Sequence, residues 1–255
     1  MPFVKIEPEK AASAIVHQVE QLILRGVLRP GERLPSEREL ATRFEVSRPT
    51  VRDALSTLEA SDLVVTRPGS GAFVAQVLGS AFAPALVNLF STHDEALFDY
   101  LSFRRDLEGM AAARAAEHAN ETDLEVIRSI FNRMEVAHEK RNPTEEAAID
   151  AEFHLAIVEA AHNVVMLHMM RSMFEMLQAG VFYNRQLLFG KRSTRCHLLE
   201  QHRAIFDAII AQNPDAARAA VEAHLTYIEG AMLQQSRDHR NENVAKQRLE
   251  HEKER

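Results

Sequence analysis

The sequence of 255 residues is poor in the residue types on which disulfide-rich and all-β folds depend. Its one cysteine, Cys196, excludes a disulfide within the chain and leads us to expect a reducing compartment, the cytoplasm. It has no tryptophan, 9 glycines and 9 prolines, too few for a sandwich or barrel whose turns recur every ~8–12 residues. No apolar run reaches the ~18 residues of a membrane-spanning helix, and the first residues lack the pattern of a secretion signal. We therefore expect a mainly α-helical protein with no membrane partner.

The formal net charge of −7, taken alone, argues against a nucleic-acid partner. The charge is unevenly distributed, however. Residues 1–78 carry as many basic as acidic residues, so the excess of negative charge lies in the remainder. Most basic residues of the N-terminal part are arginines, which form planar two-pronged contacts with phosphate or guanine. The N-terminal part thus remains a candidate for DNA binding.

The first 75 residues have the element order of a winged helix-turn-helix. A helical period over residues 10–25 precedes a Pro-Gly turn, after which Ser36 and Ser47 are candidate N-caps of a short and a longer helix. Further along, two short strands are expected at residues 63–66 and 72–74, with a turn between them.

The longer of these helices begins with residues suited to DNA. In a helix-turn-helix the recognition helix enters the major groove, where hydroxyls bind phosphate oxygens and arginines contact base edges. Those residue types stand at its start: Ser47, Arg48, Thr50 and Arg52. The complete element order favours a DNA-binding domain over a merely charged helical hairpin.

The rest of the chain is expected to form an antiparallel all-α bundle of six to seven helices, because helical periodicity continues from residue 86 to about 235. Candidate N-caps of these helices are Thr92 or Asp94, Thr122, Thr144 and Asn213. The predicted organisation is a DNA-binding domain, a linker, a helical domain that binds effector and metal, and a polar tail, at residues 1–75, 76–85, 86–235 and 236–255. The tail is either a solvated helix end or a frayed segment.

A possible metal site comes from polar residues on apolar helical segments. Asp150 and His154 are four residues apart and share one helix face. His202 and His224 also have apolar helical neighbours. Three imidazoles and a carboxylate suit a divalent ion such as zinc, nickel or manganese. Since the chain has 12 histidines, the spacing alone leaves open that these are ordinary core histidines.

The residues Leu28–Leu40 and Val46–Arg52 closely resemble the winged-helix domain of GntR-family transcription regulators. The helical remainder resembles the FCD-type ligand-binding domain of the FadR subfamily. The segment Glu159–His168 is similar to the branch that contains pyruvate dehydrogenase complex repressors and lactate-responsive repressors, although His162 stands where most relatives have glycine.

The resemblance assigns roles to particular residues. It implies a metal bound by Asp150, His154, His202 and His224, all four of which are present, whereas pyruvate-type repressors tend to lack the first two. It implies an effector contact at Arg104, with Arg105 the weaker candidate, and another at Asn163. The alternatives are a surface ion pair between Arg104 and Glu108 and a helix cap at Asn163. The implied DNA contacts are Arg38, Ser47, Arg48, Thr50, Arg52 and Gly69.

The resulting hypothesis is a homodimeric repressor that is not an enzyme and binds a near-palindromic DNA operator. A small 2-keto or 2-hydroxy acid such as pyruvate, lactate or glycolate, bound at a metal-containing site, would control its DNA affinity. One alternative is a regulator for which the metal ion itself is the effector. The other is a metalloenzyme, against which stands the absence of a separate general-base or nucleophile motif.

Overall fold

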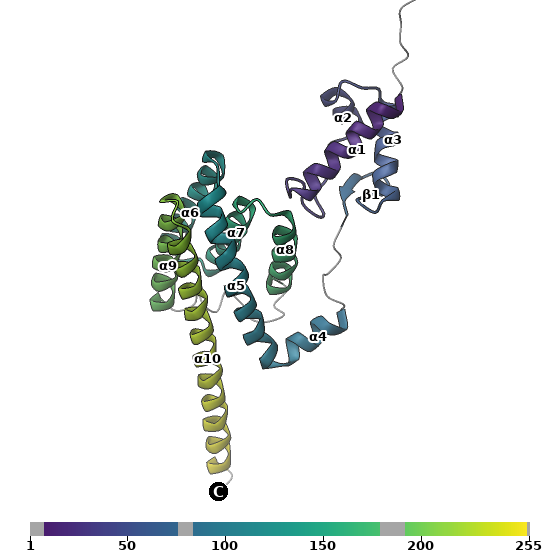
Figure 1. Cartoon of the computed structure of the whole chain (residues 1–255). Coiled ribbons are helices and arrows are strands. Elements are labelled where there is room, and N and C mark those ends of the chain that lie inside the picture. Colours follow the sequence, from purple (N-terminus) through teal and green to yellow (C-terminus); the bar gives the residue numbers. More distant parts are fainter. Residues whose placement is uncertain (1–7, 76–83, 179–191, 254–255) are drawn as a thin grey trace, which may run out of the picture. The chain divides into compact units, whose positions relative to one another are not determined.

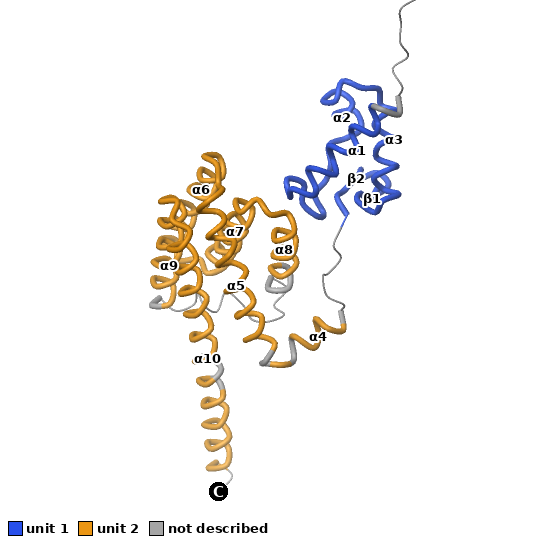
Figure 2. Tube along the Cα trace, in the orientation of Figure 1, with its two compact units in different colours: residues 1–82 blue, residues 83–255 orange. Residues whose placement is uncertain are grey.

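The computed structural model describes residues 8–75, 84–178 and 192–253. The chain forms two compact units, residues 1–82 and 83–255, which are treated separately (Figure 2). Most of the predicted linker, residues 76–83, lies outside the described residues. No helix in the described ranges is long and apolar enough to cross a membrane.

The first unit is the predicted winged helix-turn-helix (Figure 1). Its elements are α1 (Pro8–Leu24), α2 (Glu37–Arg43), α3 (Arg48–Ala60), β1 (Val64–Arg67) and β2 (Gly71–Val74). The two strands pair antiparallel and form the wing, with Val64 opposite Val74 and Arg67 opposite Gly71. The three helices and the strands enclose one core of aliphatic side chains, among them Ile15, Val19, Val51, Leu58 and Val64.

Both predicted N-caps of this unit are confirmed. Ser36 accepts a hydrogen bond from the backbone of Glu39, whose carboxylate accepts one from Ser36 in return, which completes a capping box. Ser47 accepts one from the backbone of Thr50, and Pro49 lies in the first turn, where a missing N–H costs little. Local side-chain chemistry thus sets where α2 and the recognition helix α3 begin.

The second unit contains seven helices in the part of the chain that the structure describes, which confirms the helical domain. They are α4 (Pro84–Thr92), α5 (Asp94–His118), α6 (Glu121–Lys140), α7 (Pro143–Ala160), α8 (Val164–Gln178), α9 (Arg192–Ile210) and α10 (Pro214–Lys253). The last helix runs through the predicted polar tail, and its final turns are exposed. Of the two alternatives for that segment, the structure has the solvated helix end.

Several predicted caps of this unit were wrong by two residues. Asn120 and Asn142, rather than Thr122 and Thr144, accept hydrogen bonds from the first turns of α6 and α7. The residue before α5 is His93, whose side chain makes no capping bond, so neither candidate there is the cap. Asn213 does accept a bond from the backbone of Ala216 at the start of α10. An asparagine outside the helix is placed to reach the free N–H groups, whereas a threonine already inside the first turn is not.

Helix α7 is buried on nearly every side. It packs against α5, α6 and α8, and most of its residues between Glu146 and Ala160 are buried. A helix that is enclosed all round has no polar face, so any ionisable residue on it must be paired within the protein. Asp150 and His154 are two such residues, and their helix therefore forms the central element of the candidate site.

Candidate functional site

Four buried ionisable side chains converge in the core of the second unit. Asp150 and His154 come from α7, His202 from α9 and His224 from α10. One ligand atom from each lies within 4.8 Å of those of the other three. The residues that the sequence pattern and the family resemblance grouped together are therefore neighbours in the fold.

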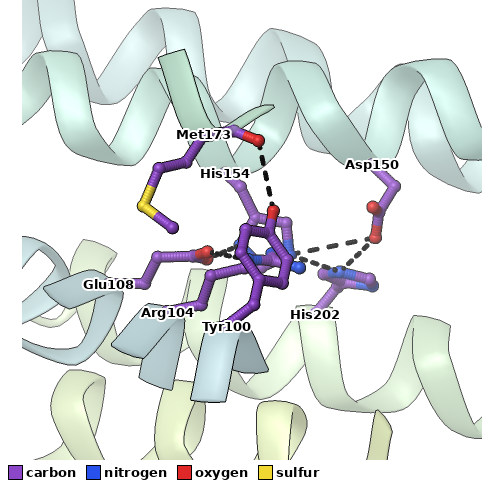
Figure 3. A network of polar contacts seen from close by, with 7 residues as sticks. All are labelled: Tyr100, Arg104, Glu108, Asp150, His154, Met173 and His202. Atoms are coloured by element: carbon purple, nitrogen blue, oxygen red, sulfur yellow. Dashed lines mark hydrogen bonds and ion pairs between the residues drawn. The ribbon is translucent and has the colours of Figure 1, made fainter. Parts of the chain in front are cut away.

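The contacts inside this cluster are short. The Nε2 atom of His202 lies 2.9 Å from an oxygen of Asp150 and 3.3 Å from the Nε2 of His154 (Figure 3). The ring of His224 stacks against that of His154 with centroids 5.2 Å apart. Aromatic rings also pack against the cluster. Phe153 lies edge-on to His202, and Phe174 lies near His154.

Two further polar side chains hold the imidazoles from outside. The Nδ1 of His154 lies 2.7 Å from a carboxylate oxygen of Glu108 on α5 (Figure 3). The Nδ1 of His224 lies 3.0 Å from the amide oxygen of Gln201. An acceptor at Nδ1 places the proton there and leaves the lone pair of Nε2 facing inward, the arrangement found around metal-ligating histidines.

One inward-facing nitrogen is left without a partner. Within the described residues, the buried Nε2 of His224 has no hydrogen-bond partner, although its side chain is 0% exposed. A buried polar atom that lacks a partner costs free energy, so such an atom in a native core requires an explanation. A cation among the four side chains would give this lone pair a partner, and the donor set fits a divalent ion.

Burial favours the neutral forms of two histidines in the cluster, His154 and His224. Burial lowers the pKa of His154, an effect that the carboxylate of Glu108 partly opposes. Burial lowers the pKa of His224 further, and the neighbouring His202 and His154 act in the same direction. Burial works to raise the pKa of Glu108, but the charge of Arg104 and the hydrogen bonds from His154 and Arg104 prevail and hold it at about 2. Neutral imidazoles are the form in which histidines bind a metal.

Arg104, the predicted effector contact, lies beside this cluster and is 0% exposed. Its Nε donates to Glu108 over 2.6 Å, and its guanidinium lies over the ring of Tyr100 (Figure 3). The guanidinium also lies over the ring of Phe174. The ion pair that the sequence suggested as an alternative therefore exists, but in the core rather than on the surface. It adds a buried positive charge next to the histidines.

The other two candidates for effector contacts have structural partners. The amide oxygen of Asn163 accepts a hydrogen bond from the backbone of Met166 and thus caps the start of α8. Arg105 contacts Glu229 of α10 at 3.1 Å on a half-exposed surface. The nearby His162 has a left-handed backbone with φ of 49°, a conformation that favours glycine.

In the first unit, most of the predicted DNA contacts are exposed, on α2, at the start of α3 and on the wing. Arg38, Ser47, Arg48 and Arg52 are exposed, and Gly69 stands in the exposed turn between the strands with φ of 73°. Thr50 differs, because it is only 8% exposed and its hydroxyl lies 2.8 Å from that of Ser47.

The recognition helix also has an internal carboxylate partner that sequence reasoning missed. Glu37 of α2 accepts hydrogen bonds from Arg52 at 2.9 and 3.3 Å, and Arg48 lies 3.9 Å away. The bond from Arg52 lowers the pKa of Glu37 despite a small opposing effect of burial. Because Glu37 and Arg52 are 15 residues apart, no local pattern signals this pair.

Comparison with known proteins agrees with this two-part architecture. Residues 11–74 match the family described as bacterial regulatory proteins, gntR family, and residues 99–227 match the FCD domain. The chain is 34% identical over 229 residues to an Escherichia coli (strain K12) protein named for regulation of the L-lactate dehydrogenase operon, covering 88% of this chain and 87% of that protein. The chain belongs to the GntR family of transcription regulators.

Other relatives of this GntR-family regulator cover similar lengths. The HTH-type transcriptional regulator LutR of Bacillus subtilis (strain 168) is 34% identical, over 83% of this chain and 96% of LutR. The Glc operon transcriptional activator of Escherichia coli (strain K12) is 30% identical, over 88% of this chain and 90% of the activator. Among solved structures, a GntR protein of Streptococcus agalactiae is similar with a TM-score of 0.51 and 25% identity, over 87% of this chain and 98% of that one. These relatives are regulators of transcription and not enzymes, so the exposed arginines of α3 belong to a DNA-binding regulator.

Proposed function

We propose that this GntR-family regulator holds a divalent metal ion at Asp150, His154, His202 and His224, and that a small carboxylate bound beside it controls DNA affinity. The observation that carries the proposal is the buried Nε2 of His224, which lacks a hydrogen-bond partner within the described residues. Three imidazole nitrogens and one carboxylate oxygen within 4.8 Å of one another form a donor set that zinc accepts readily, with nickel and manganese as alternatives.

The contacts at the outer nitrogens of the histidines support a resident metal ion rather than an ordinary cluster of core histidines. Glu108 and Gln201 accept at the outer nitrogens of His154 and His224, which fixes both rings with their inner nitrogens toward the cluster. Both ring nitrogens of an ordinary core histidine are expected to have partners, whereas the inner nitrogen of His224 has none within the described residues.

The effector class follows from charge. Arg104 carries a buried positive charge next to the cluster, where an anionic ligand gains most because water does not screen it. A bound divalent ion would supply a Lewis-acid position for a carboxylate or adjacent hydroxyl oxygen. One relative is named for an L-lactate dehydrogenase operon, which favours a 2-hydroxy acid such as lactate or glycolate over the keto acid pyruvate.

Regulation requires that the effector prefer one of two states of the protein. We propose that the regulator is a homodimeric repressor on a near-palindromic operator, because a two-fold protein reads a two-fold site. The principal DNA contacts would be Arg38, Arg48, Arg52, Ser47 and the Gly69 turn, with Thr50 supporting the hydroxyl of Ser47. A coupling of ~1–3 kcal/mol between the two sites gives roughly 5–150-fold regulation.

The proposal is tested with metal-loaded and metal-stripped protein. A duplex selected from random DNA by the full-length chain serves as the operator, and binding is followed by fluorescence anisotropy with and without L-lactate, glycolate and pyruvate. We expect one of the acids to change the operator affinity of the loaded protein only. A response that survives stripping would remove the metal from the effector site. If zinc alone switches DNA affinity and no acid does, the ion itself is the effector.

The matched variants are His202→Ala and His197→Ala, both on α9. His202 is a proposed ligand, whereas His197 is exposed and pairs with Glu200 on the same helix. Metal content measured by mass spectrometry should fall to background in the first variant and stay unchanged in the second. Equal metal content in the two would contradict the proposed ligand set.

A further inference from the structure

The last helix, α10, continues past the start of α5, the helix against which its first half packs (Figure 1). The two helices run antiparallel. Arg105 of α5 pairs with Glu229 of α10, and Gly109, one turn later on α5, lies beside the earlier Glu222. From Leu233 to Lys253, every side chain that the structure describes is exposed. The second half of α10 is thus an exposed helix.

All three arginines of this exposed half lie on one face of the helix. Arg240, Val244 and Arg248 follow one another at intervals of four residues, and Arg237 precedes Arg240 by three. Residues at these intervals lie above one another on a helix. We call these three arginines and the valine between them the basic stripe. The carboxylate of Glu242 lies on the opposite side of the helix, where it pairs with Lys246 over 2.8 Å.

The arginines of the basic stripe make no ion pair or hydrogen bond within the described residues. Elsewhere in the second unit, surface arginines such as Arg133 and Arg203 pair with carboxylates. Since Arg237 and Arg240 are three residues apart, their like charges also repel each other. An anionic partner from outside the chain would give the stripe its missing contacts and remove this repulsion.

DNA fits the stripe better than the other anionic or self-complementary partners. The stripe extends over roughly 16 Å of helix, and DNA offers a negative charge about every 1.7 Å along its axis. In a two-fold contact with a second copy, the same face meets itself, so arginines would oppose arginines. A lipid surface requires a broad apolar face, whereas Val244 is the one apolar member of the stripe.

The place of the stripe in the second unit agrees with this choice. The chain enters the second unit through α4, which joins α5 with only His93 between the two helices. The exposed half of α10 projects from this same end of α5 (Figure 1). The basic stripe therefore lies at the end of the second unit at which the chain arrives from the winged helix-turn-helix.

We propose that the basic stripe of α10 is a second DNA-binding surface, which contacts phosphates without reading base sequence. Contacts to phosphate add affinity and fix the position of a protein on the duplex, whereas base contacts supply the specificity. The stripe would thus add to the affinity of the regulator for any DNA, while α3 selects the operator. This surface acts independently of the proposed metal ion and effector.

The test compares two variants that remove the same charge from opposite sides of the exposed half of α10. One is Arg240→Gln with Arg248→Gln, and the other is Lys246→Gln with Lys253→Gln. All four side chains are exposed and glutamine supports a helix, so both variants should fold. Circular dichroism checks their helix content.

Fluorescence anisotropy then measures the affinity of the full-length proteins for the selected operator and for an unrelated duplex of equal length, between 50 and 200 mM salt. For the arginine variant we expect the slope of log affinity against log salt to become shallower by about 2 for each copy of the chain on the DNA. Its affinity at the lowest salt should fall about tenfold or more, on both duplexes alike. The lysine variant should match the unaltered protein.

A third variant, Arg240→Lys with Arg248→Lys, keeps the charge and should bind both duplexes nearly as well as the unaltered protein, because lysine also contacts phosphate. Equal salt slopes for the arginine-to-glutamine and lysine-to-glutamine variants would overturn the proposal. Sedimentation velocity shows whether the variants keep the oligomeric state of the unaltered protein. If the arginine-to-glutamine variant loses DNA affinity together with a change of oligomeric state, the stripe is a contact between copies and the proposal is wrong.

Discussion

The two units of this regulator place their functional charges in opposite environments. In residues 1–82 the arginines of α3 are exposed and their partner Glu37 is partly exposed. In residues 83–255 Arg104, Glu108 and the His–Asp cluster are buried. A DNA backbone is a large partner that can only be met at the surface, where contacts to water are exchanged for contacts to phosphate. A small ion or acid can be enclosed, and enclosure strengthens each charge interaction. The stability of the second unit therefore depends on the pairing of its buried charges, whereas that of the first unit depends little on its exposed ones.

The sharpest test of this difference uses two ion pairs of α5. Glu108→Ala removes a carboxylate that pairs with Arg104 in the core, which is expected to lower the free energy of unfolding by about 3–5 kcal/mol. Glu229→Ala removes the half-exposed partner of Arg105 and should cost at most about 1 kcal/mol. Urea denaturation of both variants measures the two values. Equal losses would show that burial of the Arg104 pair does not matter.

Removal of the proposed metal is expected to have the next largest effect. A ligand that binds only the folded state at 100 times its dissociation constant adds about 2.7 kcal/mol to stability. Chelation should therefore lower the melting temperature of the full chain, and zinc should restore it. His202→Ala protein should melt at the same temperature with and without chelator. If chelation leaves the melting temperature of the unaltered protein unchanged, the proposed buried metal centre is contradicted.

On the exposed side, Arg48→Ala should reduce affinity for the selected operator by ~1–3 kcal/mol, or roughly 5–150-fold, and relax base preference. The protein should otherwise remain as stable as before, because this side chain is exposed. Arg25→Ala, at another exposed arginine just after α1, is the matched control and should bind DNA normally. Fluorescence anisotropy measures both affinities. An unchanged affinity of the Arg48 variant would mean that α3 is not the recognition helix.

The smallest effect is expected at Glu37. Its folded-state pKa is lowered by the hydrogen bond from Arg52, so its contribution to stability is present above the unfolded-state value near 4.5 and is lost as pH falls through the lower folded-state value. The difference in melting temperature between the unaltered protein and Glu37→Gln should therefore be small near neutrality and should vanish in acid. A difference that grows as pH falls would have the wrong sign for this pair.

Sequence reasoning succeeded where interactions are local. The capping box of Ser36 and Glu39 spans three residues, and the shared face of Asp150 and His154 spans four, so both can be read from spacing. Apolar helical neighbours suggested grouping these two with His202 and His224 but left open that all were ordinary core histidines, and the family resemblance was what favoured a metal site. Helices α9 and α10 bring the last two from far along the chain.

The features that sequence reasoning missed are those that depend on packing. The outer partner Glu108 is 46 residues from His154, and no pattern relates the two positions. The depth of Arg104 was also missed, because an i, i+4 pair with Glu108 is the usual arrangement on a helix surface. Thr50 appeared suited to DNA by type, yet its place on the buried side of α3 turns it toward the core.

Helix α7 has a further consequence for how the second unit can respond. Glu146, whose two oxygens contact the guanidinium of Arg195 on α9, and Asp150, which pairs with His202 on the same helix α9, are one helical turn apart on α7. Both buried carboxylates therefore join α7 to α9. A rotation or slide of α7 against α9 would disturb the ion pair with Arg195 and the histidine cluster together.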